Sequence, residues 1–170
     1  MRLQRQWLAA LAVVGIWGVD PVDPVWMSFD AAAHTVRFKL TAGLTPLNGA
    51  LNFNGFRDGE LTLTVPEGWT VAVEFENHDG MLPHSAQVIN EVHPVPGGAK
   101  DKADIDRAYT DKAFEGLPPQ SKTGMRFVAR PAGNYLIFCG VPGHALAGMW
   151  IRFRVSAEAG EPSLEATPRS

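Results

Sequence analysis

Short stretches in which apolar and polar residues alternate recur along the chain from Thr35 onward. A two-residue period is typical of β-strands that bury one face. Turn residues such as Asn54-Gly55, Asp58-Gly59 and Pro131-Ala-Gly133 lie between the stretches. The stretches cover residues 36–40, 61–65, 71–76, 84–88, 135–139 and 149–155. Several short strands with this spacing predict an all-β domain, built as a sandwich or a barrel.

Two segments lack the alternation. Residues Pro94 to Gly124 are polar and charged, and we expect them to form one long surface excursion with room for a short helix around Asp101 to Phe114. Residues 157–170 show no periodicity and are predicted to be a polar C-terminal tail.

The chain begins with a pattern that is typical of targeting segments. Arg2 and Arg5 precede an apolar run from Trp7 to Trp17. The run is shorter than the roughly 20 residues that a membrane span needs, and no good Ala-x-Ala cleavage site follows closely. We expect a signal or a retained, marginal membrane anchor; a buried N-terminal helix is the alternative. The predicted organisation is a signal or anchor segment with a linker at 1–24, the β-domain at 25–156 and the tail at 157–170.

Composition narrows the classes of function. The net charge is −3, from 15 Lys and Arg against 18 Asp and Glu, and no basic patch of the kind that binds nucleic acid is present. Hydrophobic residues make up 45% of the chain, which is enough for a core. Cys139 is the single cysteine, so an exported chain cannot form an internal disulfide. The thiol therefore needs another role, which is intermolecular pairing, reactivity or metal binding.

The strongest chemical signal is the spacing Cys139-x4-His144-x4-Met149. A predicted strand ends at Cys139, a loop rich in Gly and Pro carries His144, and Met149 opens the last strand. One loop thus brings a thiolate, an imidazole and a thioether to one end of the domain, and His84 fits as a second imidazole from another strand. A thiolate and two imidazoles with a weak axial thioether suit both Cu(I) and Cu(II). With no open equatorial position, such a copper site serves electron transfer and not substrate chemistry.

Each of these residues, taken singly, is also compatible with an ordinary structural role. Cys139 can be a small core residue, His144 a solvated loop residue and Met149 a core residue; their joint spacing favours copper. His78, in a turn, is an alternative to His84. The remaining residues of these types are two competing axial candidates and two expected surface histidines: Met81, Met125, His34 and His93.

The C-terminal segment resembles the copper-binding loop of cupredoxins, and the span from about Trp26 to Val155 resembles the sulfocyanin group in particular. The stretches that carry the resemblance are 35–43, 51–55, 82–85 and 139–150. The resemblance implies a Greek-key β-sandwich with one type 1 copper. It also implies a membrane-associated electron carrier outside the cytoplasm (periplasmic or on the outer face of the membrane). The implied partners are redox proteins of a respiratory chain, such as a cytochrome or a terminal oxidase.

One residue departs from the pattern of many cupredoxins, which have Asn after the first histidine ligand. Here that residue is Ser85, as in rusticyanins, which the sequence resembles in this feature. In the family, the backbone N–H of this residue donates to the thiolate, and its side chain often ties to the residue after the cysteine. That residue is Gly140, which offers no side chain, so the tie is in question. Because hydrogen bonds around the sulfur tune the potential, we expect a fairly high reduction potential.

The surroundings of His144 suggest where partners dock. The expected apolar rim around this histidine consists of Val141, Pro142, Ala145, Leu146 and Ala147. An exposed apolar patch of this kind is typical of an interaction site. We therefore expect electrons to pass through His144 to a docked redox protein.

Three rival interpretations stay open. A copper-delivery protein of the same fold would bind Cu(I) reversibly without shuttling electrons. A copper enzyme would need a second metal site, typically built with His-x-His pairs, and the sequence contains no such pair. The third is a β-sandwich that binds no metal.

Overall fold

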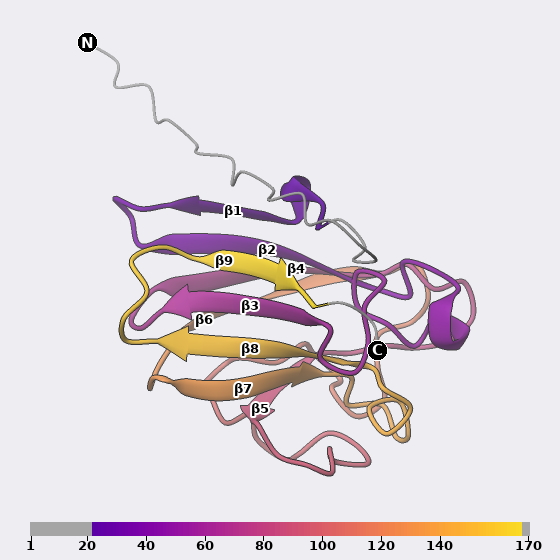
Figure 1. Cartoon of the computed structure of the whole chain (residues 1–170). Helices are drawn as coiled ribbons and strands as arrows, with labels where there is room; N and C mark the ends of the chain where they lie inside the picture. Colours follow the sequence, from indigo (N-terminus) through magenta and orange to yellow (C-terminus); the bar gives the residue numbers. More distant parts are fainter. Residues whose placement is uncertain (1–21, 168–170) are drawn as a thin grey trace.

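Two β-sheets stack face to face in the computed structural model, which describes residues 22–167 (Figure 1). The strands of the described part are β1 (Met27–Asp30), β2 (Thr35–Ala42), β3 (Leu61–Pro66), β4 (Thr70–Asn77), β5 (Gln87–Asn90), β6 (Lys122–Val128), β7 (Gly133–Phe138), β8 (Trp150–Ser156) and β9 (Ser163–Ala166). Two short 3-10 helices are η1 (Pro24–Trp26) and η2 (Leu47–Ala50). One sheet has the strand order β1-β2-β4-β6 and the other β5-β7-β8-β3-β9. Neighbours are antiparallel except β2 with β4 and β3 with β8, which are parallel.

The alternation in the sequence becomes the inner and outer faces of the sheets. In β2, Val36, Phe38 and Leu40 are fully buried, whereas Arg37 and Lys39 are exposed. The inward side chains of both sheets form one apolar cluster between the layers, as expected for aligned sheets that pack about 10 Å apart. The predicted all-β sandwich is confirmed.

Three strands lie outside the stretches that the alternation predicts. They are β1, β6, which overlaps the end of the predicted excursion, and β9, which lies within the predicted polar tail. All three are edge strands. Backbone hydrogen bonds to a single neighbour hold such a strand. Each buries at most two apolar side chains, Met27 and Phe29 in β1 and Met125 and Phe127 in β6, so the apolar period is too short to stand out in the sequence. In β9, for example, no residue is fully buried, although Leu164 and Ala166 pack against the core.

The excursion between β5 and β6 contains no α-helix, so the short helix expected around residues 101–114 is wrong. Its backbone instead bonds to β5 and to the residue just before this strand. The N–H of Asp104 donates to the carbonyl of Val88 (3.0 Å), and the N–H of Thr110 donates to that of Ala86 (2.8 Å). A backbone that is paired outward in this way cannot form the local bonds of a helix.

No helix within residues 22–167 is long and apolar enough to cross a membrane. The apolar run from Trp7 to Trp17 lies outside the described residues, and the expectation of a signal or anchor there stays a prediction. The division of the chain at residues 24 and 156 also stays a prediction.

The end of the sandwich on the right of Figure 1 gathers the loops that matter for function. β7 ends and β8 begins there, and the loop between them carries the predicted Cys139, His144 and Met149. β4 also ends on this side, and the chain turns after Asn77 to reach His84.

Candidate metal centre

The loop between β7 and β8 folds on itself through backbone hydrogen bonds. Cys139 follows β7 directly, and its N–H donates to the carbonyl of Met149 (3.1 Å), the residue before β8. The N–H of Met149 donates in turn to the carbonyl of His144 (3.1 Å). These bonds close the loop, so the three predicted side chains start from neighbouring backbone positions.

His84 reaches the same place from the segment between β4 and β5. It lies before β5 and not within a strand as predicted, in an isolated bridge with Leu117 of the excursion. The N–H of His84 donates to the carbonyl of Leu117 (3.2 Å), and the N–H of Leu117 donates back to the carbonyl of His84 (2.8 Å). The backbone of this histidine is therefore fixed on both sides.

The structure brings the thiol and both imidazoles together. The Cys139 Sγ lies 3.5 Å from the Nδ1 of His144 and 3.9 Å from the Nδ1 of His84. One ligand atom from each of the three residues lies within 4.8 Å of the other two. The imidazole rings are tilted by 57° with their centres 5.1 Å apart.

These distances fit a metal ion that the three atoms would hold between them. With bonds of about 2.0 Å to nitrogen and about 2.3 Å to sulfur, a trigonal angle of about 120° places sulfur and nitrogen about 3.7 Å apart, between the two observed values. Met149 is fully buried and adjoins Cys139 and His144 through the backbone bonds above. The donor set of thiolate, two imidazoles and thioether is that of a blue-copper site.

Burial and nearby charges shift the pKa values of the groups that would bind the metal. Burial lowers the pKa of His84, opposed by the nearby Asp79 carboxylate. Burial, with the neighbouring His84, lowers the pKa of His144 to about 4. Both imidazoles are therefore neutral at neutral pH, with lone pairs available. Burial raises the pKa of the Cys139 thiol, so a bound cation is needed to hold it as thiolate.

The hydrogen bonds around the Cys139 sulfur show how Ser85 is tied to Gly140, although Gly140 has no side chain. The N–H of Ser85 donates to the Cys139 Sγ (3.5 Å), as the resemblance implies. The Ser85 hydroxyl accepts the backbone N–H of Gly140 (3.0 Å) and donates to the carbonyl of Ala113 (2.6 Å). The tie to the residue after the cysteine thus exists and needs no side chain there, because a backbone N–H makes it.

Gly140 itself has no room for a side chain. A Cβ at this position would lie 2.5 Å from the carbonyl oxygen of Ala113 and 2.6 Å from the Cβ of Ala99. The excursion that carries Ala99 and Ala113 therefore packs directly against the thiol-bearing loop, which the expectation of a surface excursion does not include.

Asp79 is a buried residue at the site that the sequence patterns did not single out. Its carboxylate oxygen Oδ2 lies 3.0 Å from the Nε2 of His84, and the two side chains are 8% and 0% exposed. Burial raises the pKa of this carboxyl, but hydrogen bonds from His84, Met81 and Leu82 outweigh it and leave the pKa below its usual value. The sequence offers one signal, a carboxylate in the turn five residues before the predicted ligand.

The competing candidates lie elsewhere. The side chain of His78 is 51% exposed and pairs with Glu76 (3.8 Å), and Met81 is 83% exposed. Met125 is buried in the core from β6. His34 and His93 are exposed, as predicted.

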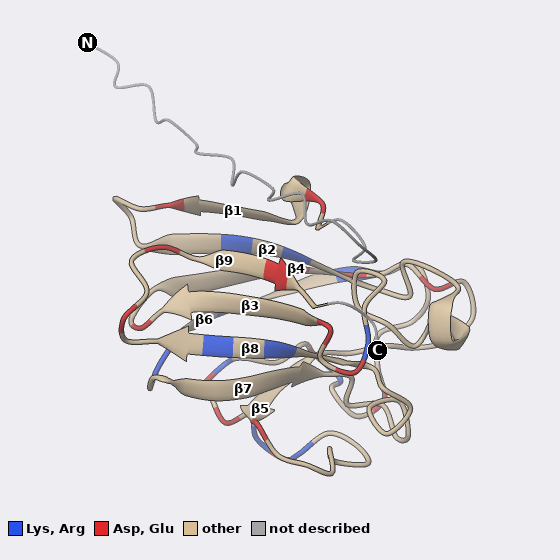
Figure 2. Cartoon of the chain, viewed as in Figure 1, with Lys and Arg blue, Asp and Glu red and all other residues tan. Residues whose placement is uncertain are grey.

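The rim around His144 largely matches the prediction. Leu146 is 62% exposed and Pro142 is also exposed, but Ala145 is only 1% exposed and does not belong to the surface. The loop from 139 to 149 contains no Lys, Arg, Asp or Glu and is tan throughout in Figure 2. His144 is partly exposed, whereas His84 is fully buried, so His144 is the imidazole that solvent or a partner reaches.

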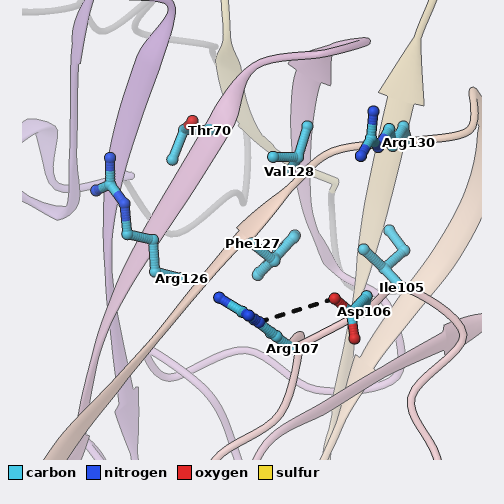
Figure 3. Close-up of a pocket in the computed structure, with 8 residues that line it drawn as sticks. All are labelled: Thr70, Ile105, Asp106, Arg107, Arg126, Phe127, Val128 and Arg130. Atoms are coloured by element: carbon cyan, nitrogen blue, oxygen red, sulfur yellow. Dashed lines mark ion pairs between the residues drawn. The ribbon is translucent and has the colours of Figure 1, made fainter.

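A separate cavity of about 340 Å³ lies near the start of β4 and the end of β6 (Figure 3). Arg107, Arg126 and Arg130 line it, and Arg107 pairs with Asp106 (3.8 Å). β4 spans the roughly 25 Å between this end of the sheet and the turn near His84. No cysteine, histidine or methionine lines the cavity, so it has none of the soft ligands of the candidate centre.

Comparison with known proteins gives one family. The family model described as the sulfocyanin (SoxE) domain matches residues 23–164. A sulfocyanin from Sulfolobus acidocaldarius is 30% identical over 105 residues, which are 58% of this chain and 52% of that protein. The match thus spans about half the length of the curated relative.

Solved structures agree on the fold. Rusticyanin, described as a copper protein, is 27% identical with a TM-score of 0.52, over 72% of this chain and 83% of that one. Auracyanin A, described as a blue copper protein from Chloroflexus aurantiacus, is 20% identical with a TM-score of 0.51, over 72% of this chain and 99% of that one. These similarities confirm the Greek-key sandwich that the resemblance to cupredoxins implies.

Proposed function

The chain belongs to the sulfocyanin family of cupredoxins, and we propose that it is a single-electron carrier that uses one type 1 copper. The observation that carries the proposal is the convergence of one buried thiol and two imidazoles at trigonal distances. We assign the copper ligands to His84, Cys139, His144 and Met149. When bound, copper supplies the Cu(I)/Cu(II) couple.

The protein's own contribution is to hold these ligands still. Backbone bonds fix Cys139 to Met149 and Met149 to His144, and a double bridge fixes His84 to Leu117. A ligand set that does not rearrange when its charge changes allows fast electron transfer, because little has to move. These four side chains would occupy the metal and leave no position for a substrate, which supports a carrier and not an enzyme.

The route of the electron follows from exposure. His144 is the ligand that is partly accessible, and the uncharged loop around it presents Leu146 to solvent. Phe114 of the excursion, 54% exposed, extends this surface. A Cβ added at Gly97 would lie 3.6 Å from Leu146, and one at the next residue 3.4 Å from Phe114, so the two apolar side chains flank the same short segment. A redox partner that docks on this surface reaches the copper through His144.

The setting that we propose is a respiratory chain outside the cytoplasm, periplasmic or on the outer face of the membrane. The support is the basic and apolar N-terminal pattern from Arg2 to Trp17, which is typical of export. A cytochrome or a terminal oxidase is the proposed kind of partner, and a retained N-terminal segment would keep the carrier at the membrane.

An optical and paramagnetic-resonance spectrum of the copper-loaded protein tests the proposal. We expect an intense thiolate-to-copper charge-transfer band that bleaches on reduction and returns on oxidation, and the Cys139→Ser variant should lack it. Colourless or weakly coloured copper in the wild-type chain would favour copper delivery instead. A chain that binds no copper would refute the proposed function.

A further inference from the structure

A buried carboxylate stands behind one of the two imidazoles of the metal centre. Asp79 lies in the turn between β4 and His84, and its Oδ2 is 3.0 Å from the His84 Nε2. Its other oxygen, Oδ1, accepts the backbone N–H groups of Met81 (2.8 Å) and Leu82 (3.3 Å). One carboxylate oxygen of Asp79 thus stabilises the turn, and the other contacts the imidazole of His84.

The turn that carries Asp79 is held from several sides. The Asn77 side chain accepts the N–H of Asp79 (3.1 Å), and the amide of Gln120 donates to the carbonyl of Asp79 (3.2 Å). Gly43 packs so closely that a Cβ there would lie 2.9 Å from the Cβ of Asp79. The carboxylate therefore cannot turn away from His84 without disturbing its neighbours.

The arrangement selects one tautomer of His84. The Nδ1 faces the Cys139 Sγ, and the Nε2 faces a carboxylate that can only accept when ionised. The proton must then lie on Nε2, which leaves the Nδ1 lone pair free for the metal. Carboxylates that accept from the outer nitrogen of a ligating histidine fix the ring and make it a stronger ligand.

We propose that Asp79 is a positioning residue of the copper centre, which orients His84 through its Nε2–H and favours Cu(II) over Cu(I). This inference rests on the proposed function. A negative charge beside a ligand stabilises the more positive metal state, and at this buried position solvent screens the charge weakly. Asp79 therefore lowers the reduction potential from the value that the hydrogen bonds to sulfur would otherwise set.

The Asp79→Asn variant tests this, because it keeps the shape of the side chain and removes the charge. We expect Cu(II) binding to weaken about tenfold to a hundredfold, as is typical for such partners, with a smaller loss for Cu(I). If Cu(I) binding is unchanged, a tenfold loss corresponds to a reduction potential about 59 mV higher. Cyclic voltammetry and Cu(II) competition titrations measure both quantities.

Asp58→Asn is the matched control. It makes the same change in net charge, and Asp58 lies against the copper loop, since a Cβ at Gly148 would be 2.7 Å from its Oδ1. Its side chain is half exposed and pairs with Arg57 (3.3 Å), which lies outside the proposed ligand set. The reduction potential of the Asp58→Asn variant should stay close to that of the wild type. An equal shift in both variants would overturn the role assigned to Asp79.

A measurement on the unmodified protein covers the case in which Asp79→Asn folds poorly. A long-range ¹H–¹⁵N spectrum of the Cu(I) protein should show His84 protonated at Nε2, with a slowly exchanging proton. Protonation elsewhere, or an unchanged potential in a folded blue Asp79→Asn variant, would refute the role of Asp79 while the carrier function stands. A wild-type chain without a blue copper site would refute the carrier function and, with it, the inference.

Discussion

Ser85→Ala is the substitution that most directly tests how the metal centre is held together. The Ser85 hydroxyl makes two short hydrogen bonds, one accepted from the N–H of Gly140 (3.0 Å) and one donated to the carbonyl of Ala113 (2.6 Å), and it has a long contact of 4.0 Å with the Cys139 Sγ. It thereby joins three segments, which are the turn before β5, the excursion and the loop between β7 and β8. Alanine removes both bonds but leaves the backbone N–H that donates to the Cys139 sulfur.

The magnitude follows from the burial of the two partners. Gly140 is buried, so its N–H is left without an acceptor, at a cost of about 1–3 kcal/mol. Ala113 is partly exposed, and water can replace its lost donor, so this bond is worth about 0.5–1.5 kcal/mol. We expect the free energy of unfolding to fall by about 1.5–4.5 kcal/mol. The blue colour should persist, because all four proposed ligands and the N–H to sulfur remain.

Urea unfolding of the metal-free wild type and variant measures the loss without the contribution of copper binding. Ser121→Ala is the control, since the Ser121 hydroxyl donates to the carbonyl of Pro118 (2.6 Å) at an exposed position. The control should lose less than about 0.5 kcal/mol. If the Ser85 variant lost no more than the control, the hydroxyl would not join the three segments and the reasoning would fail.

Three further outcomes are expected. Met149→Leu should retain the blue site and raise the reduction potential in voltammetry, because the thioether is a weak donor that favours Cu(II); an unchanged potential would count against Met149 as axial ligand. Leu146→Asp should slow electron exchange with the physiological partner and leave the visible spectrum unchanged, and an equal rate would contradict docking at this loop. In the metal-free protein, the free energy of unfolding should fall as the pH drops from about 6.5 to about 4, and below that it should no longer depend on this group. The reason is that burial lowers the pKa of His144 to about 4, whereas the unfolded chain takes up the proton at a higher pH. Urea unfolding at several pH values measures this, and the free energy of unfolding of His144→Gln should change less with pH.

The local part of the site was predictable from the sequence, and the reason is the length of the loop. Cys139, His144 and Met149 lie within eleven residues between two strands with clear alternation, so strand ends alone bring them close. His84 is 55 residues from Cys139, and its place depended on the resemblance of its flanking residues. The alternation over 84–88 predicted a strand there, but the backbone of His84 lies in an isolated bridge before β5.

The hydrogen bonds of Gly140 and Asp79 beside the site were not predictable, because backbone groups and turns make them. The tie to Ser85 uses the N–H of Gly140, and every residue except proline offers such a group, so residue identity gives no signal. The bond from His84 to Asp79 depends on how a turn directs one carboxylate. Edge strands such as β9 depend on backbone pairing more than on an apolar face.

Backbone hydrogen bonds of this kind also give the long excursion between β5 and β6 a role at the metal centre. Its N–H at Ala99 donates to the carbonyl of Gly140 (2.7 Å), its carbonyl at Gly97 accepts the N–H of Gly143 (2.9 Å), and Leu117 pairs with His84. The same segment thus contacts the chain beside each of the two imidazoles and beside the thiol. If this segment were free to move, the ligands could adopt different positions in the Cu(I) and Cu(II) states, and each such rearrangement would slow electron transfer. Because one segment bonds to both stretches that carry the proposed ligands, the excursion holds them in fixed relative positions. Its length allows it to reach all of these positions.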